Sequence, residues 1–184
     1  MVRFFSLCAS FWYPYSLTDF NRMAPTPSTE PSGYMQTLTR YLSNIMNSTL
    51  LGLPREIKEL IYFDALSHAA DKILAIPLSP SLKRINPNGV AALATDVSYL
   101  SAFVDTLENA PILKQNLDEL EQTVLLMQTE NPDEFYDIGV RNRKFGRVDA
   151  MNGPVLLEKL THSVQSPTRT DRLANFSRAW GAKG

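Results

Sequence analysis

Mostly apolar residues recur every three or four positions along residues 53–76, which is the pattern of one helix face. A second apolar row widens this face, so the helix is expected to pack on two sides and to form the central rod of a helical stack. Pro54 suits the first helical turn, and Pro77 and Pro80 are expected to end the helix. The first row is Ile57, Leu60, Ile61, Ala65, His68, Ala69, Lys72, Ile73 and Ile76, and the second is Phe63, Leu66, Ala70 and Leu74.

The same spacing predicts further helices before and after this segment. A tight joint at residues 52–53 makes the first two helices antiparallel neighbours. Asn86 followed by Pro87, and Asn131 followed by Pro132, are typical of helix starts, because Asn caps the first turn and Pro needs no hydrogen-bond partner there. The expected helices cover residues 34–50, 87–109, 110–127, 132–138 and 155–160, the last after a turn at 152–154.

Strand signals are almost absent, because no alternating apolar run is bounded by hairpin turns. The expected fold class is all-α: a bundle of stacked antiparallel helices with no sheet. Phe135, Tyr136 and Ile138 are expected to fix the short helix that carries them onto this bundle. Three parts are predicted: an N-terminal extension and Pro/Ser/Thr-rich linker at 1–33, the all-α domain at 34–162, and a mostly disordered tail at 163–184 that lacks helical periodicity.

Composition adds few constraints. The chain has 184 residues, of which 44% are hydrophobic and 20% charged, and this is enough for one domain with a core. Its formal net charge of -1 provides no overall field that would attract nucleic acid. The single Cys8 cannot form an intramolecular disulfide, which indicates a reducing compartment. No run reaches the ~20 apolar residues needed to span a bilayer.

The segment from Phe4 to Tyr13 is apolar and aromatic and follows Arg3, so it loosely resembles a signal peptide. Pro14 interrupts the run, and no small-residue cleavage site follows it. Two alternatives stay open. The aromatic side chains pack on the domain as a lead-in, or Met1 is not where the natural chain begins.

The chemical inventory is poor, and no enzymatic function is expected from it. Asp64 lies one turn before His68 on the same side of the expected helix, where the two could act as a base and its orienting acid. A structural histidine in a polar packing contact is the favoured interpretation, and a catalytic pair would require both residues to line an open cleft. The chain has no phosphate-binding glycine loop, no GxSxG or HExxH motif and no Cys/His cluster, so neither a cofactor nor a metal site is expected.

The first candidate for partner binding is the Pro/Ser-rich joint between the second and third expected helices. Lys83 and Arg84 provide positive charge there, and Asn86 and Asn88 lie beside them. The two asparagines already have a structural explanation, Asn86 as a helix cap and Asn88 as a first-turn residue. Arg is favoured at interface hot spots, so the four residues together form a candidate rim for a partner.

The second candidate is the basic segment 141–148, which contains Arg141, Arg143, Lys144 and Arg147. A solvated surface is the plain interpretation of such a charge run. The functional alternative is contact with an acidic partner or with anionic lipid headgroups, where each basic residue contributes about 1 kcal/mol. Nucleic acid is not expected, because it would require a larger basic excess and stacking aromatic residues.

Several of these segments, in order, resemble one protein family. The stretches LPREIKELIYFDALSHAADKIL, KRINPNGVAALATDVSYLSAFVD and RNRKFGRVDAMNGPVLLEKL are similar to the C-terminal end of the exocyst complex subunit Sec15, and YMQTLTRYLSNIMNSTLLGLP fits in the manner of filamentous-fungal members. The resemblance covers residues 19–160. Because it is an ordered series of segments, it is more specific than a single short motif.

The resemblance implies a tethering subunit without catalytic activity. Members of the family are all-α, and their C-terminal region is an effector site for a Rab-family GTPase on secretory vesicles. The subunit links the vesicle to the other exocyst subunits at the plasma membrane, which implies a cytoplasmic, peripheral location at sites of polarised secretion. Full members are several times longer and carry an N-terminal coiled region that joins the complex, so this chain corresponds to a fragment or to a misjudged gene start.

Overall fold

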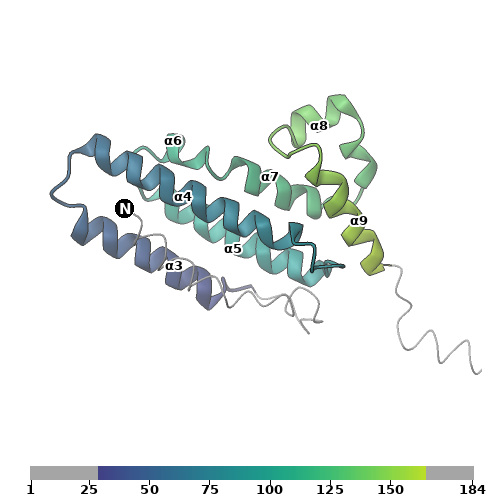
Figure 1. Ribbon diagram of the computed structural model, residues 1–184, viewed down its shortest axis with the longest axis horizontal. Coiled ribbons are helices and arrows are strands. Elements are labelled where there is room, and N and C mark those ends of the chain that lie inside the picture. The colour runs from purple at the N-terminus through teal and green to yellow at the C-terminus, as the bar shows by residue number, and fades with distance from the viewer. Residues whose placement is uncertain (1–28, 165–184) are drawn as a thin grey trace, which may run out of the picture.

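The computed structural model describes residues 29–164, and within this range every regular element is a helix (Figure 1). The all-α prediction is therefore confirmed. The expectations for residues 1–28, including the aromatic N-terminal segment, and for residues 165–184 lie outside the described residues. The helices are α3 Gly33–Asn44, α4 Arg55–Leu78, α5 Pro87–Asp105, α6 Ala110–Lys114, α7 Asp118–Met127, α8 Ile138–Lys144 and α9 Asn152–Val164, with a π-helical turn at Ile45–Thr49 and the 3-10 turn η2 at Pro132–Phe135.

The long helices run back and forth along the long axis of the molecule (Figure 1). Helices α3 and α4 meet at one end and run antiparallel, α5 returns in the direction opposite to α4, and α6 and α7 together form the fourth pass. Helices α8 and α9 lie at the opposite end, beside the joint between α4 and α5. This is the antiparallel stack expected from the sequence, with a small cap of helices added at one end.

Helix α5, rather than α4, lies at the centre of the bundle. It contacts α3 on one side and both α6 and α7 on the other. Buried residues occur along its whole length, from Val90 to Val104, whereas the buried residues of α4 begin only at Leu66. The prediction that α4 is the central rod is therefore wrong, because α3 packs against α5 and leaves the first half of α4 without a cover. The buried residues of α5 are Val90, Leu93, Asp96, Val97, Leu100 and Val104.

Helix α4 begins and ends slightly differently from the prediction. Pro54 is its N-cap and precedes the first turn, where its carbonyl oxygen accepts the N–H of Ile57 at 3.2 Å and of Lys58 at 3.1 Å. Pro77 does not stop the helix, which ends at Leu78. A proline in the last turn is tolerated because the chain tightens there: Ser79 N–H donates to the carbonyl of Ile76 at 3.2 Å.

The predicted fourth helix is two helices. The chain breaks between α6 and α7, where Leu117 N–H donates to the carbonyl of Lys114 at 2.7 Å and Asn116 N–H to that of Leu113 at 3.2 Å. Each of these hydrogen bonds joins a residue to the third residue before it, which is the pattern of a tight 3-10 turn. Leu113, before this turn, and Leu117, within it, are both buried in the core.

A second, smaller core joins α8 and α9 to the end of α7. Phe135 lies at its centre, 1% exposed, with its ring centroid 6.2 Å from that of Phe145. Tyr136 and Ile138 are 60% and 68% exposed, so the prediction that they fix this region is wrong and Phe135 alone does so. Residues 152–154, expected as a turn, form the start of α9. The cluster consists of Leu126, Phe135, Phe145, Val148 and Leu157.

Candidate partner-binding surface

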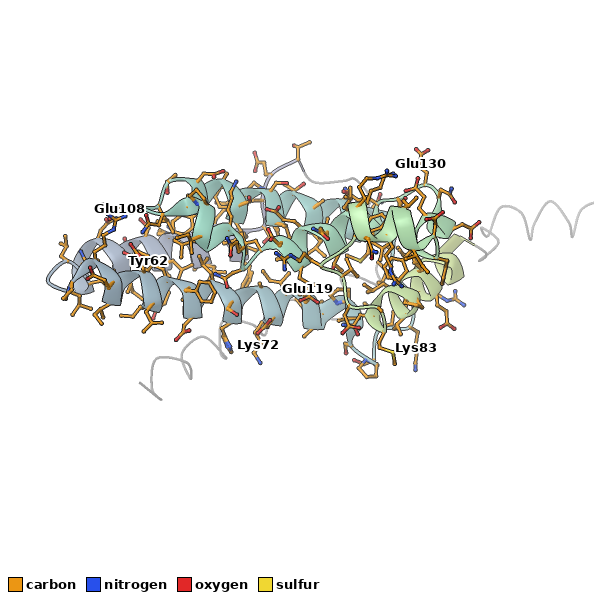
Figure 2. All side chains as sticks on the ribbon, turned by 90° about the horizontal axis from the view of Figure 1, so that it is seen from above. Tyr62, Lys72, Lys83, Glu108, Glu119 and Glu130 are labelled. Carbon is orange, nitrogen blue, oxygen red and sulfur yellow. The ribbon has the colours of Figure 1, made fainter. Side chains whose placement is uncertain are left out.

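The joint between α4 and α5 is anchored by buried apolar residues and carries its basic residues on the surface. Leu82 and Ile85 are fully buried, and Lys83 and Arg84 between them are exposed. The two buried apolar side chains hold the backbone in place, and the two basic side chains between them face the solvent. The structure thus places the two basic residues of the first candidate site on the surface, and Figure 2 shows Lys83 at one end of the bundle.

The two asparagines of this site have mainly structural roles. The side-chain oxygen of Asn86 accepts the backbone N–H of Asn88 at 2.9 Å, which confirms Asn86 as the cap of α5. Both residues are partly buried. Any partner contact at this joint therefore depends more on Lys83 and Arg84 than on the asparagines, which position the start of α5.

Helix α9 holds the joint in place through a residue that was not singled out from the sequence. The ammonium of Lys159 donates to the carbonyl oxygens of Pro77 at 2.8 Å and Ser79 at 3.0 Å, at the C-terminal end of α4. The carbonyl of Lys159 in turn accepts the N–H of Ile85 at 3.1 Å. A cation at a helix C-terminus satisfies unpaired carbonyls and the helix dipole. Burial lowers the pKa of Lys159, and the positive charge of Lys83 lowers it further.

We expect Lys159→Met to destabilise the protein by about 1 kcal/mol, because the two carbonyls lose their donor while the aliphatic stem is kept. The loss is limited because burial already disfavours the charged amine. The midpoint of thermal unfolding measures it. Lys72→Met, an exposed lysine on α4, is the matched control and should leave the midpoint unchanged; an equal loss in both variants would contradict the capping role.

A groove lies next to the joint, between the start of α5, the end of α7 and α9, and we call it the end groove. Its volume is about 480 Å³. Its lining is mostly apolar, and Glu130 is the single charged residue in it. Figure 2 shows Glu130 and Lys83 at the same end of the molecule, on opposite edges in that view. The apolar lining residues are Pro87, Val90, Ala91, Met127, Pro132, Leu157 and Leu160.

The basic segment of the second candidate site is largely engaged within the protein. The guanidinium of Arg141 lies 5.7 Å from the ring centroid of Phe135, and Lys144 pairs with Glu134 at 2.8 Å. Arg147 approaches the carboxylate of Asp118 at 3.6 Å, and its backbone N–H donates to the side-chain oxygen of Gln122 at 2.7 Å. These contacts attach α8 and the loop after it to η2 and α7.

Arg143 differs from its three basic neighbours. It is exposed and makes no ion pair with any residue between 29 and 164. The four basic residues therefore do not act as one free cationic patch, and Arg143 is the member most available to a lipid or an acidic partner.

An apolar strip on α4, at the end of the molecule away from the joint, was not expected to be exposed. Leu53, Ile57, Leu60 and Phe63 are 37%, 44%, 57% and 40% exposed. Leu53 lies just before α4, and the other three follow one another at helical spacing along its first half. Periodicity alone could not identify them as surface residues, because it shows that a face is apolar and not whether another element covers it.

The candidate catalytic pair does not form a site. Asp64 is exposed and His68 partly buried, and neither lines the end groove or the polar hollow between α3, α4 and the end of α5. Among residues 29–164 no group of His, Cys, Asp and Glu could hold a metal ion. No helix in that range combines the length and apolar character required to cross a bilayer.

Glu119 on α7 is partly buried and lies near two other carboxylates, those of Asp149 and Asp71. Burial raises its pKa, and repulsion by Asp149 and Asp71 raises it further. An acid whose pKa is higher in the folded state destabilises that state once it ionises. The penalty is absent below the ordinary glutamate pKa and complete above the raised one.

Glu119→Gln is therefore expected to stabilise the protein at pH 7 by about 0.3 to 0.5 kcal/mol. Chemical denaturation at pH 7 and at pH 3.5 measures the effect, and the gain should disappear at the lower pH. Glu121→Gln, on the exposed side of the same helix, is the control and should show no such pH-dependent gain. A gain that persists at pH 3.5 would show that charge is not its cause.

Comparison with known proteins decides the family. Residues 15–159 match the family described as exocyst complex subunit Sec15 C-terminal. The chain belongs to this family. The match includes all of the helices up to most of α9, together with residues 15–28, so the Sec15 resemblance of the separate segments is confirmed.

Relatives of this Sec15 C-terminal chain are found in a yeast and in a plant. The exocyst complex component sec15 of Schizosaccharomyces pombe is 26% identical over 143 residues, which cover 77% of this chain and 19% of the relative. Exocyst complex component SEC15A of Arabidopsis thaliana is 25% identical over 143 residues, covering 73% of this chain and 18% of the relative. Exocyst complex component SEC15B of the same plant is 23% identical over 132 residues, which cover 68% of this chain and 17% of the relative. These identities are too close to separate a fungal from a plant type.

The chain spans about a fifth of the length of these relatives. No solved structure matches it.

Proposed function

We propose that this chain is a non-enzymatic tethering module of the exocyst, which acts in the docking of secretory vesicles at the plasma membrane during exocytosis by binding a Rab-family GTPase. The match of residues 15–159 to the exocyst complex subunit Sec15 C-terminal family is the observation that carries the proposal. The module works in the cytoplasm, peripheral to the plasma membrane or to sites of polarised secretion.

The end of the bundle at the α4–α5 joint suits a GTPase. The switch regions of a GTPase become ordered when γ-phosphate is bound, and a binding surface can read that ordered state. Protein interfaces combine an apolar centre with a polar rim. The end groove would supply the apolar part, and the neighbouring joint, where Lys83 and Arg84 are exposed beside Asn86 and Asn88, would supply the polar rim.

The test is a pulldown of a panel of Rab-family GTPases, each loaded with GDP or with a non-hydrolysable GTP analogue. Capture of at least one member in the GTP-analogue form, and little or none in the GDP form, is the expected result. If no member binds in a nucleotide-dependent manner, the GTPase part of the proposal fails while membership in the family stands.

The exposed apolar strip on α4 is our candidate for contact with other exocyst subunits. Three neighbouring apolar side chains in the first half of α4, with Leu53 just before the helix, suit a second helix packed alongside. Leu60→Glu is expected to abolish co-purification with co-expressed exocyst subunits. Leu125→Glu, an equally exposed leucine on α7, should leave co-purification intact; loss in neither variant, or in both, would reject this strip as the contact.

The alternative function is binding of anionic lipid through the basic segment 141–148. Among the basic residues of this segment, only Arg143 is exposed without an ion pair. Lipid binding would therefore depend mainly on Arg143, and the test should change this residue alone. Reversal of all four basic residues would also break the contacts that hold α8. Flotation with phosphatidylserine vesicles should therefore compare the parent chain with Arg143→Glu alone. Unchanged flotation of this variant would remove the lipid proposal.

A further inference from the structure

The end groove is an apolar surface that no described element covers, and the chain continues directly from its wall. Leu157 and Leu160 of α9 line the groove, and α9 ends at Val164, one helical turn beyond Leu160. Residues 165–184 follow this point and lie beyond the residues 15–159 that match the family. The segment is therefore tethered next to the groove, and a tethered segment has a high effective concentration at a nearby site.

The sequence of this segment suits an apolar groove. Leu173, Phe176 and Trp180 are spaced three and four residues apart, which would place them on one face of a helix. A helix docked in a groove uses anchors at this spacing. The eight residues before Leu173 span up to about 26 Å when extended, which is ample for a return of a few helical turns to the groove.

The charges of the two partners are complementary. Residues 165–184 contain four basic residues and one acid. Residues 115–140, which provide the α7 and η2 wall of the groove, contain seven acids and neither Lys nor Arg. On this wall Glu130 and Asp133 form no ion pair with any residue that the structure describes, so they remain available to a cationic segment.

We propose that the chain's own C-terminal segment docks in the end groove, with Leu173, Phe176 and Trp180 as anchors and its basic residues toward Glu130 and Asp133. This inference does not depend on the proposed function, because it concerns one chain in isolation; a docked segment would occupy the apolar surface proposed above for a GTPase, so the two would compete for the groove.

The test uses the accessibility of Trp180 in the full chain. Trp12→Phe removes the other tryptophan, so that fluorescence reports Trp180 alone. Acrylamide should quench Trp180 several-fold less efficiently than it quenches N-acetyltryptophanamide. Ala91→Arg, which places a bulky cation in the groove, should remove this protection, and Ala102→Arg at an exposed position of the same helix should retain it.

A second variant distinguishes the loss of docking from damage to the helical bundle. Phe176→Asp changes only the segment and should free Trp180 while the thermal midpoint of the bundle falls little. The proposal is overturned if Trp180 is quenched as freely as the model compound in the parent chain, or if protection survives both Ala91→Arg and Phe176→Asp. Protection that decreases on dilution would mean that the segment of a second copy fills the groove, which overturns docking within one chain.

Discussion

Substitution of Gly153 by alanine should destabilise the protein by about 2 to 3 kcal/mol, the range of an overpacked core. Gly153 is buried in the first turn of α9, where the backbone lies directly on the ring of Phe135. A Cβ at this position would overlap Cζ and Cε1 of that ring and would lie 2.9 Å from Cε2. The ring cannot simply move away, because it is 1% exposed and also packs against Phe145.

Urea denaturation of Gly153→Ala and of the parent chain measures this loss. Gly52→Ala is the matched control, because nothing lies within 4 Å of a Cβ built there. Its φ is not positive, so alanine is compatible with the turn and should be neutral or slightly stabilising. A stable Gly153→Ala variant would show that α9 can move away from η2 at little cost, and would contradict the second core as described.

The features that were predicted correctly from the sequence are those encoded by neighbouring residues. The cap of Asn86 joins two residues that are two positions apart, and the cap of Asn131 on Asp133 does the same at 3.2 Å. Helical spacing likewise reports on three or four positions at a time, and it located every long helix. Local signals of this kind need no knowledge of the rest of the fold.

The errors concern contacts between distant parts of the chain. The apolar strip at Leu53, Ile57, Leu60 and Phe63 has the same pattern as a buried face, and only the packing of α3 on α5 explains its exposure. Lys159 contacts carbonyls about 80 positions earlier in the chain, and its sequence neighbourhood, VLLEKL, gives no sign of this.

The candidate site was predicted in part. Lys83 and Arg84 are exposed, as a binding role requires. Their position between the two apolar residues Leu82 and Ile85 is a local signal of this exposure. The end groove beside them could not be predicted, because it brings together residues of α5, α7 and α9. The basic segment at 141–148 was predicted less well. Three of its four basic residues contact acidic or aromatic side chains of the same protein and do not form a free positive patch.

Simultaneous reversal of Lys83 and Arg84 to glutamate should weaken nucleotide-dependent GTPase binding about tenfold or more, which corresponds to about 1.4 kcal/mol. Both residues are exposed, so the reversal changes the electrostatic complementarity of the joint without opening the core. The buried Leu82 and Ile85 continue to hold the backbone. Lys83→Glu also replaces a repulsion with an attraction toward Lys159, so the joint should stay folded.

The measurement is a titration of the double variant with the GTPase selected by the pulldown, loaded with the GTP analogue. Lys58→Glu combined with Lys72→Glu is the matched control, because it changes the net charge equally on α4, away from the joint. Loss in the joint variant alone would assign the GTPase to this end of the bundle. Equal loss in both pairs would indicate attraction by overall charge, and full binding by the joint variant would move the contact to another surface, with the exposed strip of α4 as the next to be changed.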